Sequence, residues 1–225
     1  MGVNTRTTKE NIAIMNISLE VENIEVLTKL LTALLVVENC DMNEEVVISQ
    51  NAINKVQSGY LTANIKAGEI LKVEQLLNLI VISSYSDVSN ALAEHIAGST
   101  EEFVNMMNKK SIEIGCTNSN FVNCNGEHDV NHYSTAHDMA LIGKYAMQYD
   151  EIKNIVGKIS YEIGETNQYK GENRLYETSN EMILSGSNNY YKYAKGIKVS
   201  FTTPAGYCIM AYAEKNDMPI IVFPQ

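Results

Sequence analysis

The most constraining feature of this 225-residue chain is a change in its hydrophobic periodicity. Between residues 27 and 149, apart from residues 41–70, most segments have the apolar spacing and capping residues that are typical of helices. After that the period changes to two, and residues 194–202, 207–214 and 218–223 alternate as strands do. Residues 11–20 alternate as well, so one strand is expected ahead of the helices. The order predicts an α+β fold, with an antiparallel sheet flanked by helices and a central helical lobe.

The first helical segment is marked by an apolar stripe at i, i+3, i+4, i+7 and i+8. Its members are Leu27, Leu30, Leu31, Leu34 and Leu35. Residues 73–82 are almost continuously apolar and predict a buried helix. Residues 41–70, between these two segments, are expected to form short loops and strands.

Capping residues predict the bounds of two further helices. Asp87 is expected to cap a helix that stops at Gly98, because a short acidic side chain can accept hydrogen bonds at a helix start and glycine permits a left-handed end. Ser134 or Thr135 is expected to cap another helix over residues 136–149.

A third helix has signals at both of its ends. Ser99 and Glu102 form a capping-box pattern ahead of residues 100–114, and Gly115 follows as the end. Further on, residues 215–217 predict a tight turn between the last two strands.

Composition narrows the classes of partner. The net charge is −10, and the 17 basic residues are scattered, whereas a phosphate backbone requires clustered Lys and Arg. Nucleic acid is therefore not expected as the main partner. No apolar run approaches the length of a membrane span, and no apolar leader follows a basic start.

Cysteine and histidine spacing predicts no metal or other cofactor. Cys40, Cys116, Cys124 and Cys208 form no C-x-x-C pair. Cys116 and Cys124 could be neighbours around one loop, but spacing alone leaves their connectivity open, and buried thiols are the expected state. Among the histidines, His132 and His137 lie five positions apart, off the i, i+4 spacing of a helical metal site.

Three segments, taken in order, carry the chemistry. The first is Glu25-Val26-Leu27-Thr28-Lys29, the second is Ser84-Tyr85-Ser86-Asp87, and the third is Gly196-Ile197-Lys198-Val199-Ser200-Phe201. They resemble the S-x-x-K, S-x-N and K-T-G elements of penicillin-recognising enzymes. The resemblance is to the serine D-Ala-D-Ala carboxypeptidases, the low-molecular-mass penicillin-binding proteins of peptidase family S11. Residues 90–99, 121–126 and 132–140 are similar to that family as well.

The resemblance covers roughly residues 23–223 and implies a fold and a location. The expected fold is that of penicillin-binding-protein and β-lactamase-like transpeptidases, shortened at both ends. We expect a single carboxypeptidase-like domain over residues 1–225, with a helical lobe at roughly 41–150 inserted between sheet segments. With no export signal visible, two locations stay open: a cytoplasmic chain, or a chain whose export signal has been removed. The family works outside the cytoplasmic membrane, which favours the second.

Each of the three elements is altered at a chemically decisive position. Acyl transfer needs a hydroxyl three residues before the lysine, and Val26 stands there ahead of Lys29. In the second element Ser84 keeps its hydroxyl, whereas Ser86 replaces an asparagine that would hold the substrate. Lys29 and Ser84 are thus expected remnants of a catalytic site.

The third element keeps its positive charge and loses its other groups. Lys198 remains, Val199 removes the hydroxyl that binds the substrate carboxylate, and Ser200 adds a side chain where the substrate backbone approaches closely. The backbone N–H of Phe201 would still point to the oxyanion hole. The resemblance therefore assigns substrate-side positions to Ser86, Val199, Ser200 and Phe201.

Two functions remain open at this point. The first is a catalytically inactive carboxypeptidase-like domain of peptidoglycan metabolism that binds a stem peptide or a protein partner. The second is an active serine hydrolase that uses a hydroxyl outside the motif position, such as Ser84; Ser83 and Thr28 are the other hydroxyls expected nearby. The resemblance also predicts that Lys29, Ser84 and Lys198 converge on one cleft between the sheet and the helical lobe, with Val26 on its floor facing Ser200.

Overall fold

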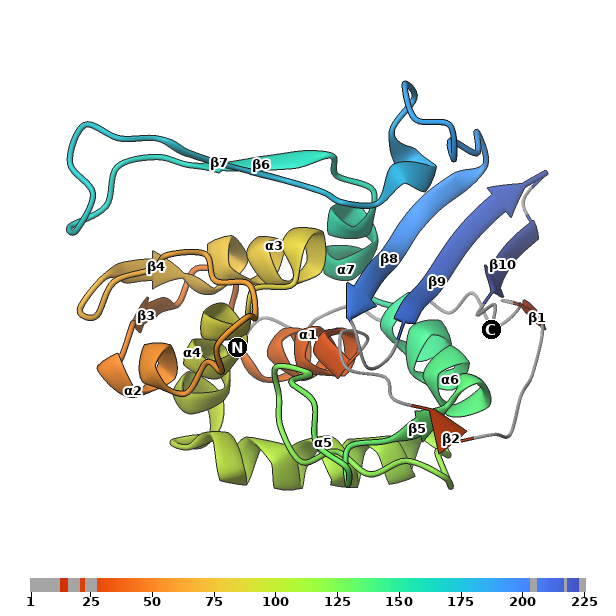
Figure 1. Ribbon diagram of the computed structural model, residues 1–225, viewed down its shortest axis with the longest axis horizontal. Coiled ribbons are helices and arrows are strands. Elements are labelled where there is room, and N and C mark those ends of the chain that lie inside the picture. The colour runs from red at the N-terminus through yellow and green to blue at the C-terminus, as the bar shows by residue number, and fades with distance from the viewer. Residues whose placement is uncertain (1–12, 16–20, 23–27, 203–205, 217, 223–225) are drawn as a thin grey trace.

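The computed structural model describes residues 13–15, 21–22, 28–202, 206–216 and 218–222. Within these, a four-stranded sheet stands beside a group of helices, and small two-stranded ribbons lie at the periphery (Figure 1). No helix within the described ranges combines the length and the apolar character needed to cross a membrane. The α+β architecture predicted from the periodicity is confirmed.

The main sheet has the strand order β1-β10-β9-β8. Its strands are β1 (Ala13–Met15), β8 (Ala194–Thr202), β9 (Gly206–Lys215) and β10 (Met218–Val222). The pairs β8/β9 and β9/β10 are antiparallel, as predicted, whereas β1 joins β10 in parallel. Of the strand expected over residues 11–20, the described part is limited to β1. Asn216, with φ of 52°, begins the expected tight turn, and Asp217 lies outside the described residues.

The helices agree with the apolar patterns, with differences at some ends. They are α1 (Thr28–Asn39), α2 (Gln50–Asn54), α3 (Val73–Ser83), α4 (Ser86–Ala97), α5 (Thr100–Ile114), α6 (Ala136–Ala146) and α7 (Asp150–Val156). Two differences lie around residue 149. The predicted helix 136–149 ends at Ala146, and α7 occupies the region where period two was expected to begin. The five-residue α2 lies within a segment that was expected to contain only loops and strands.

The capping predictions were right in most places. Ser99 Oγ accepts from the Glu102 N–H at 3.1 Å, and Thr135 Oγ1 accepts from the Asp138 N–H at 3.1 Å. Gly98 and Gly115 end α4 and α5 with φ of 78° and 102°, the left-handed conformation that glycine adopts without strain.

The predicted cap at Asp87 was wrong. Helix α4 begins at Ser86, its cap position is Tyr85, and Asp87 lies inside the first turn. The Asp87 carboxylate is buried and accepts from the Ala63 N–H at 2.9 Å and from the Val88 N–H at 2.9 Å. The Asp87 carboxylate therefore links the segment around Ala63 to the start of α4. Local sequence cannot reveal this contact, because the two residues are 24 positions apart.

The remaining strands form three short ribbons. They are β2 (Val21–Glu22) with β5 (Ser134–Thr135), β3 (Glu45–Val47) with β4 (Ile70–Lys72), and β6 (Ser160–Ile163) with β7 (Arg174–Glu177). The β6/β7 ribbon packs on α3 and extends as an arm along that side of the molecule (Figure 1). A short helix, η1 (Glu181–Ile183), then leads to β8, against which it packs.

Helix α1 lies at the centre of the core. Its residues from Thr28 to Val37 are all buried, because α3, α4, α5, α6 and α7 pack around it. A helix that is buried on every side cannot leave a polar residue in solvent. The polar residues of its first turn, Thr28 and Lys29, therefore have to find partners inside the protein.

Candidate active site

Lys29 lies in the first turn of α1 and is 2% exposed. Its ammonium group donates a hydrogen bond to the main-chain carbonyl of Asn125. A buried cation is tolerated only when it is paired or hydrogen-bonded, so this carbonyl is a necessary partner. Lys29 also interacts electrostatically with Glu127, because its charge lowers the pKa of the Glu127 carboxyl against the larger effect of burial, which raises it.

Glu127 is itself buried, at 3% exposure. Burial raises the pKa of its carboxyl, and this effect is opposed by the Gln57 N–H, which donates at 3.1 Å, and by the charge of Lys29. Lys29 thus donates a hydrogen bond to one residue of the loop of residues 122–127, Asn125, and interacts electrostatically with another, Glu127.

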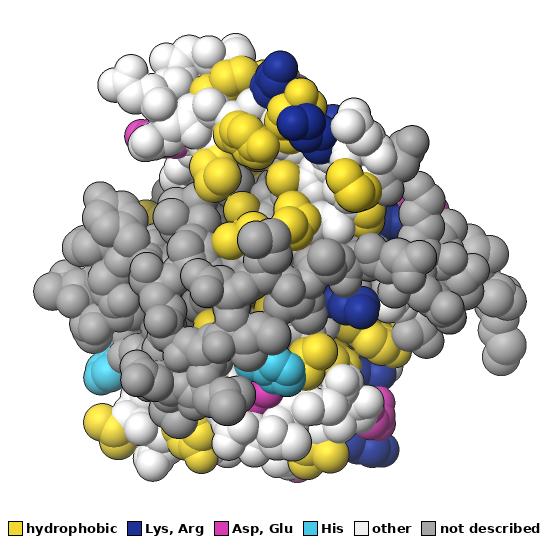
Figure 2. Space-filling view, turned by 90° about the vertical axis from the view of Figure 1, so that its right-hand side faces the viewer, with side chains coloured by type: hydrophobic (Ala, Val, Ile, Leu, Met, Phe, Trp, Pro, Cys, Tyr) yellow, Lys and Arg dark blue, Asp and Glu magenta, His cyan; other side chains and the backbone are white. Residues whose placement is uncertain are grey.

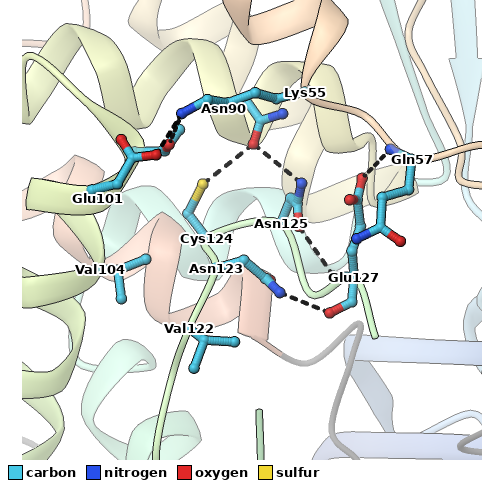
Figure 3. A pocket seen from close by; sticks show the side chains of 11 residues that line it. Lys55, Gln57, Asn90, Glu101, Val104, Val122, Asn123, Cys124, Asn125 and Glu127 are labelled. Atoms are coloured by element: carbon cyan, nitrogen blue, oxygen red, sulfur yellow. Dashed lines mark hydrogen bonds and ion pairs between the residues drawn. The ribbon is translucent and has the colours of Figure 1, made fainter. Parts of the chain in front are cut away.

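That loop is held from both sides. Thr32 Oγ1 donates to the Cys124 carbonyl at 2.7 Å, one turn along α1 from Lys29. Asn90 of α4 accepts from Asn125 Nδ2 at 3.1 Å and from Cys124 Sγ at 3.4 Å, and its own amide donates to the Ala52 carbonyl at 3.0 Å. Figure 3 shows Asn90 positioned between Cys124 and Asn125 in this network. The carbonyl that receives Lys29 is therefore fixed in place.

A cavity of about 220 Å³ lies against the same loop. It is lined by Lys55, Gln57, Asn90, Thr100, Glu101, Val104, Val122, Asn123, Cys124, Asn125 and Glu127 (Figure 3). Lys55 and Glu101 form an ion pair of 2.7 Å in its wall. Because Asn125 and Glu127 contribute to both, the cavity and the surroundings of Lys29 share one wall.

Thr28 is the hydroxyl residue next to Lys29, and it is fully buried. Its Oγ1 lies 2.6 Å from His132 Nε2, while His132 Nδ1 accepts from the Val122 N–H at 3.2 Å. Since Nδ1 is the acceptor, Nε2 carries the proton and donates to Thr28. Burial, the largest effect, lowers the pKa of His132 to about 4, so the ring is neutral at pH 7. His132 consequently anchors Thr28 and does not act as a base towards it.

Ser84 occupies the two-residue junction between α3 and α4. Its φ of 63° is left-handed, a conformation that a residue other than glycine adopts at some energetic cost and that clusters at functional sites. The residue is half-buried. Ser86, two residues on, is 1% exposed, and its Oγ finds no hydrogen-bond partner within the described part of the chain.

The third element lies on β8, next to β9. In the strand register Lys198 pairs with Met210, Val199 with Ile209, Ser200 with Cys208 and Phe201 with Tyr207. The side chains of Lys198, Val199, Ser200 and Phe201, and Val26 altogether, lie outside the described residues. Helix α3 contacts both α1 and β8, so the helix that ends at Ser84 adjoins the elements that carry Lys29 and Lys198. Convergence of Lys29, Ser84 and Lys198 on one cleft stays a prediction.

Several residues around Lys29 were not singled out from the sequence as site residues. Asn125 and Glu127 lie more than 90 positions from Lys29, and the sequence suggests no role for the His132 side chain beyond a metal pattern with His137, which its spacing disfavours. A usable signal existed, because Asn125 and His132 belong to the stretches 121–126 and 132–140 that resemble the family. The cysteine expectation was confirmed for Cys116 and Cys124, which are buried free thiols.

Comparison with known proteins identifies the family. Residues 7–223 match the model of the D-alanyl-D-alanine carboxypeptidase family, peptidase S11. The chain is 36% identical over 203 residues to D-alanyl-D-alanine carboxypeptidase DacF of Bacillus subtilis, covering 87% of this chain and 49% of the relative. It is 29% identical to DacC of Escherichia coli, again over 203 residues, covering 87% of this chain and 48% of that protein. The chain thus spans about half the length of the curated relatives it matches.

Solved structures agree on the fold. The Streptomyces K15 DD-transpeptidase superposes with a TM-score of 0.80 at 24% identity, covering 90% of this chain and 79% of the other. A D-alanyl-D-alanine carboxypeptidase from Mycobacterium tuberculosis gives a TM-score of 0.79 at 22% identity, covering 90% and 72%. Together with the family match over nearly the whole sequence, these findings establish that the chain belongs to the D-alanyl-D-alanine carboxypeptidase family, peptidase S11.

Proposed function

We propose that this chain is a carboxypeptidase-like domain of peptidoglycan metabolism that binds the D-Ala-D-Ala end of a stem peptide without cleaving it. The single observation that carries the proposal is Val26, three residues before Lys29 within the family match. An alkyl side chain cannot attack a carbonyl carbon, so no acyl-enzyme forms at that position.

The surroundings of Lys29 support this proposal. In the family mechanism, a lysine one turn after the nucleophile takes the proton of its hydroxyl. Here the Lys29 ammonium donates to a carbonyl oxygen. Thr28, the adjacent hydroxyl, is sealed in the core and already receives a hydrogen bond from His132. Neither residue is arranged to deliver a nucleophile to a substrate.

Residual binding rests on groups that need no nucleophile. Lys198 keeps a positive charge on β8, and the strand supplies a backbone N–H at Phe201, both suited to a peptide with a terminal carboxylate. Val199 and Ser200 remove a hydroxyl and narrow the approach, so we expect the binding to be weaker than in a relative with an intact K-T-G element.

The alternative is an active hydrolase that uses Ser84. Its support is the left-handed backbone of Ser84, which is half-buried at a helix junction. The argument against it is the loss of the family's nucleophile, around which the oxyanion hole is arranged. Removing a single oxyanion-hole donor already lowers the rate about 10²–10³-fold. A nucleophile at another position would lose more than one of these hydrogen bonds in the transition state, so its rate should be lower still.

Intact-protein mass spectrometry after incubation with a penicillin separates the two functions. We expect the mass to stay unchanged. A stoichiometric increase equal to the mass of the drug would overturn the proposed inactivity. If such an adduct appeared and Ser84→Ala abolished it, the alternative would be established.

Binding needs a separate measurement. Isothermal titration calorimetry with a peptide ending in D-Ala-D-Ala should give saturable heat, and the same peptide ending in L-Ala-L-Ala should not. Lys198→Ala should weaken the binding. Equal heats for both peptides, or none for either, would contradict stem-peptide binding and would leave a protein partner as the occupant of the cleft.

A further inference from the structure

We propose that the chain carries a binding site for a zinc-class divalent cation, formed by Cys40, Glu44 and His95. One ligand atom from each residue, namely Cys40 Sγ, a Glu44 carboxylate oxygen and a His95 ring nitrogen, lies within 4.8 Å of the other two. His95 Nε2 and Glu44 Oε2 are 3.1 Å apart. The inference uses none of the residues of the proposed peptide site and is independent of it.

The fold brings three separate segments to this point. Cys40 directly follows α1, Glu44 directly precedes β3, and His95 lies in the last turn of α4. Eleven residues separate Cys40 from Lys29, about 16 Å at the rise of an α-helix. The cluster is therefore at the opposite end of α1 from the candidate active site.

The backbone of Cys40 and of Glu44, together with the Glu44 carboxylate, is fixed by hydrogen bonds before any ion binds. The Cys40 N–H donates to the Val36 carbonyl at 3.0 Å, which continues the helical hydrogen bonding of α1. The Glu44 carbonyl accepts from the Val73 N–H at 2.9 Å, so α3 fixes the backbone there. One carboxylate oxygen, Glu44 Oε1, accepts from the Asp41 N–H at 2.8 Å, and the other faces His95. Such outer hydrogen bonds orient metal ligands.

The donor set selects the cation. A thiolate, an imidazole and a carboxylate are all zinc ligands, with bond lengths of about 2.0–2.3 Å. Tetrahedral angles then place ligand atoms roughly 3.3–3.8 Å apart, so closing around the ion takes shifts of about 1 Å. Calcium and magnesium require oxygen ligands and do not match a set containing sulfur and nitrogen.

Charge and exposure agree with an open site. Binding displaces the Cys40 proton to solvent, and the thiolate and the carboxylate then neutralise the two positive charges of the ion. Glu44 and His95 are exposed and Cys40 is half-buried, so a water molecule can occupy the fourth position. The ion would join the segment after α1 to α4 and stabilise the folded state.

Cobalt(II) provides a direct spectroscopic probe of this site. The metal-free protein should bind one Co²⁺ and develop both the visible bands of a tetrahedral ion and a near-ultraviolet band from thiolate-to-cobalt charge transfer. Zn²⁺ should displace it. Cys40→Ala should abolish the charge-transfer band, whereas the matched Cys116→Ala should keep it, because Cys116 is a buried thiol elsewhere in the fold. His95→Gln should weaken binding at least tenfold, in the usual range for the loss of a ligand or its orienting partner.

If a substituted chain folds poorly, the thermal stability of the unmodified chain still tests the proposal. At a hundredfold excess of Zn²⁺ over its Kd, the Tm of the unmodified chain should rise by at least about 5 °C, and Ca²⁺ or Mg²⁺ should not change it. No rise in Tm with Zn²⁺, Co²⁺ binding without a charge-transfer band, or a band that survives Cys40→Ala would each overturn the proposal.

Discussion

Thr28, Lys29 and His132 are polar residues placed where hydrophobic packing alone would exclude them. Each has a partner: a ring nitrogen for Thr28, a carbonyl for Lys29, and a backbone N–H for His132. Buried polar groups without partners would each cost about 1–3 kcal/mol. The start of α1 therefore retains a satisfied polar network even though Val26 stands at the nucleophile position.

His132 makes stability dependent on pH. Its pKa falls from 6.5 to about 4 on folding, chiefly because of burial, with Asp129 opposing the shift and Lys29 and His128 adding to it. Below pH 6.5 the unfolded chain takes up a proton that the folded chain refuses until about pH 4. The free energy of unfolding should therefore decrease as pH falls through that window, by on the order of 3 kcal/mol in all.

Urea denaturation between pH 7.5 and 4.5 checks this. His132→Gln should remove this part of the pH dependence, while His128→Gln, at an exposed position, should keep it. Burial raises the pKa values of Asp87 and Glu127, which contribute with the opposite sign in every variant, so the difference between variants isolates His132. Identical pH slopes for His132→Gln and the unmodified chain would contradict the assignment.

Restoring the nucleophile should not be sufficient to restore catalysis. Val26→Ser alone is expected to release little or no D-Ala from a D-Ala-D-Ala peptide, because Val199 and Ser200 leave the substrate carboxylate unanchored. Val26→Ser combined with Val199→Thr and Ser200→Gly should exceed the product of the separate effects, by about 10² or more, since groups that act as a unit are not additive. Family-like turnover from the single change would refute this account of the third element.

At the scale of elements, α7 and β8 approach each other at glycines. A Cβ on Gly157 would lie 3.0 Å from the Lys195 carbonyl, and one on Gly196 would lie 2.7 Å from the Val156 carbonyl. Gly196 also has φ of 137°, which side-chain-bearing residues rarely adopt. This contact seats the strand that carries Lys198 against the helical part of the molecule.

Gly196→Ala should therefore lower the free energy of unfolding by about 3 kcal/mol or more. The causes are backbone strain at the positive φ and a clash of the new Cβ with the main-chain carbonyl of Val156. The matched control is Gly186→Ala, because a Cβ there meets nothing within 4 Å. Its effect should stay within about 0.5 kcal/mol. Chemical denaturation of both variants tests the difference, and equal free energies of unfolding would show that the close approach is not maintained in solution.

For the whole molecule, one core joins the sheet and the helical lobe. Buried side chains in contact extend from Leu31 in α1 through Leu77 in α3 and Met139 in α6 to Ile221 in β10. We propose on this basis that residues 1–225 form a single domain, with the lobe of roughly residues 41–150 inserted between sheet segments. Figure 2 shows the sheet side of this molecule, where hydrophobic side chains gather beside basic ones towards the top.

A single domain should unfold in one step. Thermal unfolding followed by far-ultraviolet circular dichroism, which reports secondary structure, should coincide with the near-ultraviolet signal of the tyrosines, which reports tertiary packing. Separate transitions, with the sheet and the lobe melting at different temperatures, would show that the two parts are independent domains.

The sequence alone determined the elements whose signals are local. Helix α5 could be bounded from Ser99 and Gly115, and β8, β9 and β10 from their alternation, because caps and periodicity act over a few residues. The short helices α2 and α7 were not predicted, because five to seven residues span fewer than two turns and show no clear apolar repeat. The family motifs also single out Lys29 and Ser84 as remnants of a catalytic site, and this assignment stays a prediction.

Only the tertiary structure decided the contacts between distant segments. The parallel pairing of β1 with β10, the carbonyl of Asn125 that receives Lys29, and the grouping of Cys40, Glu44 and His95 each join positions far apart in sequence. No local pattern encodes such a pairing. The contact between Lys29 and Asn125 arises because burying one continuous core around α1 requires each enclosed polar group to be satisfied by the segment that packs beside it, whereas the other two pairings follow from how the fold brings distant segments together.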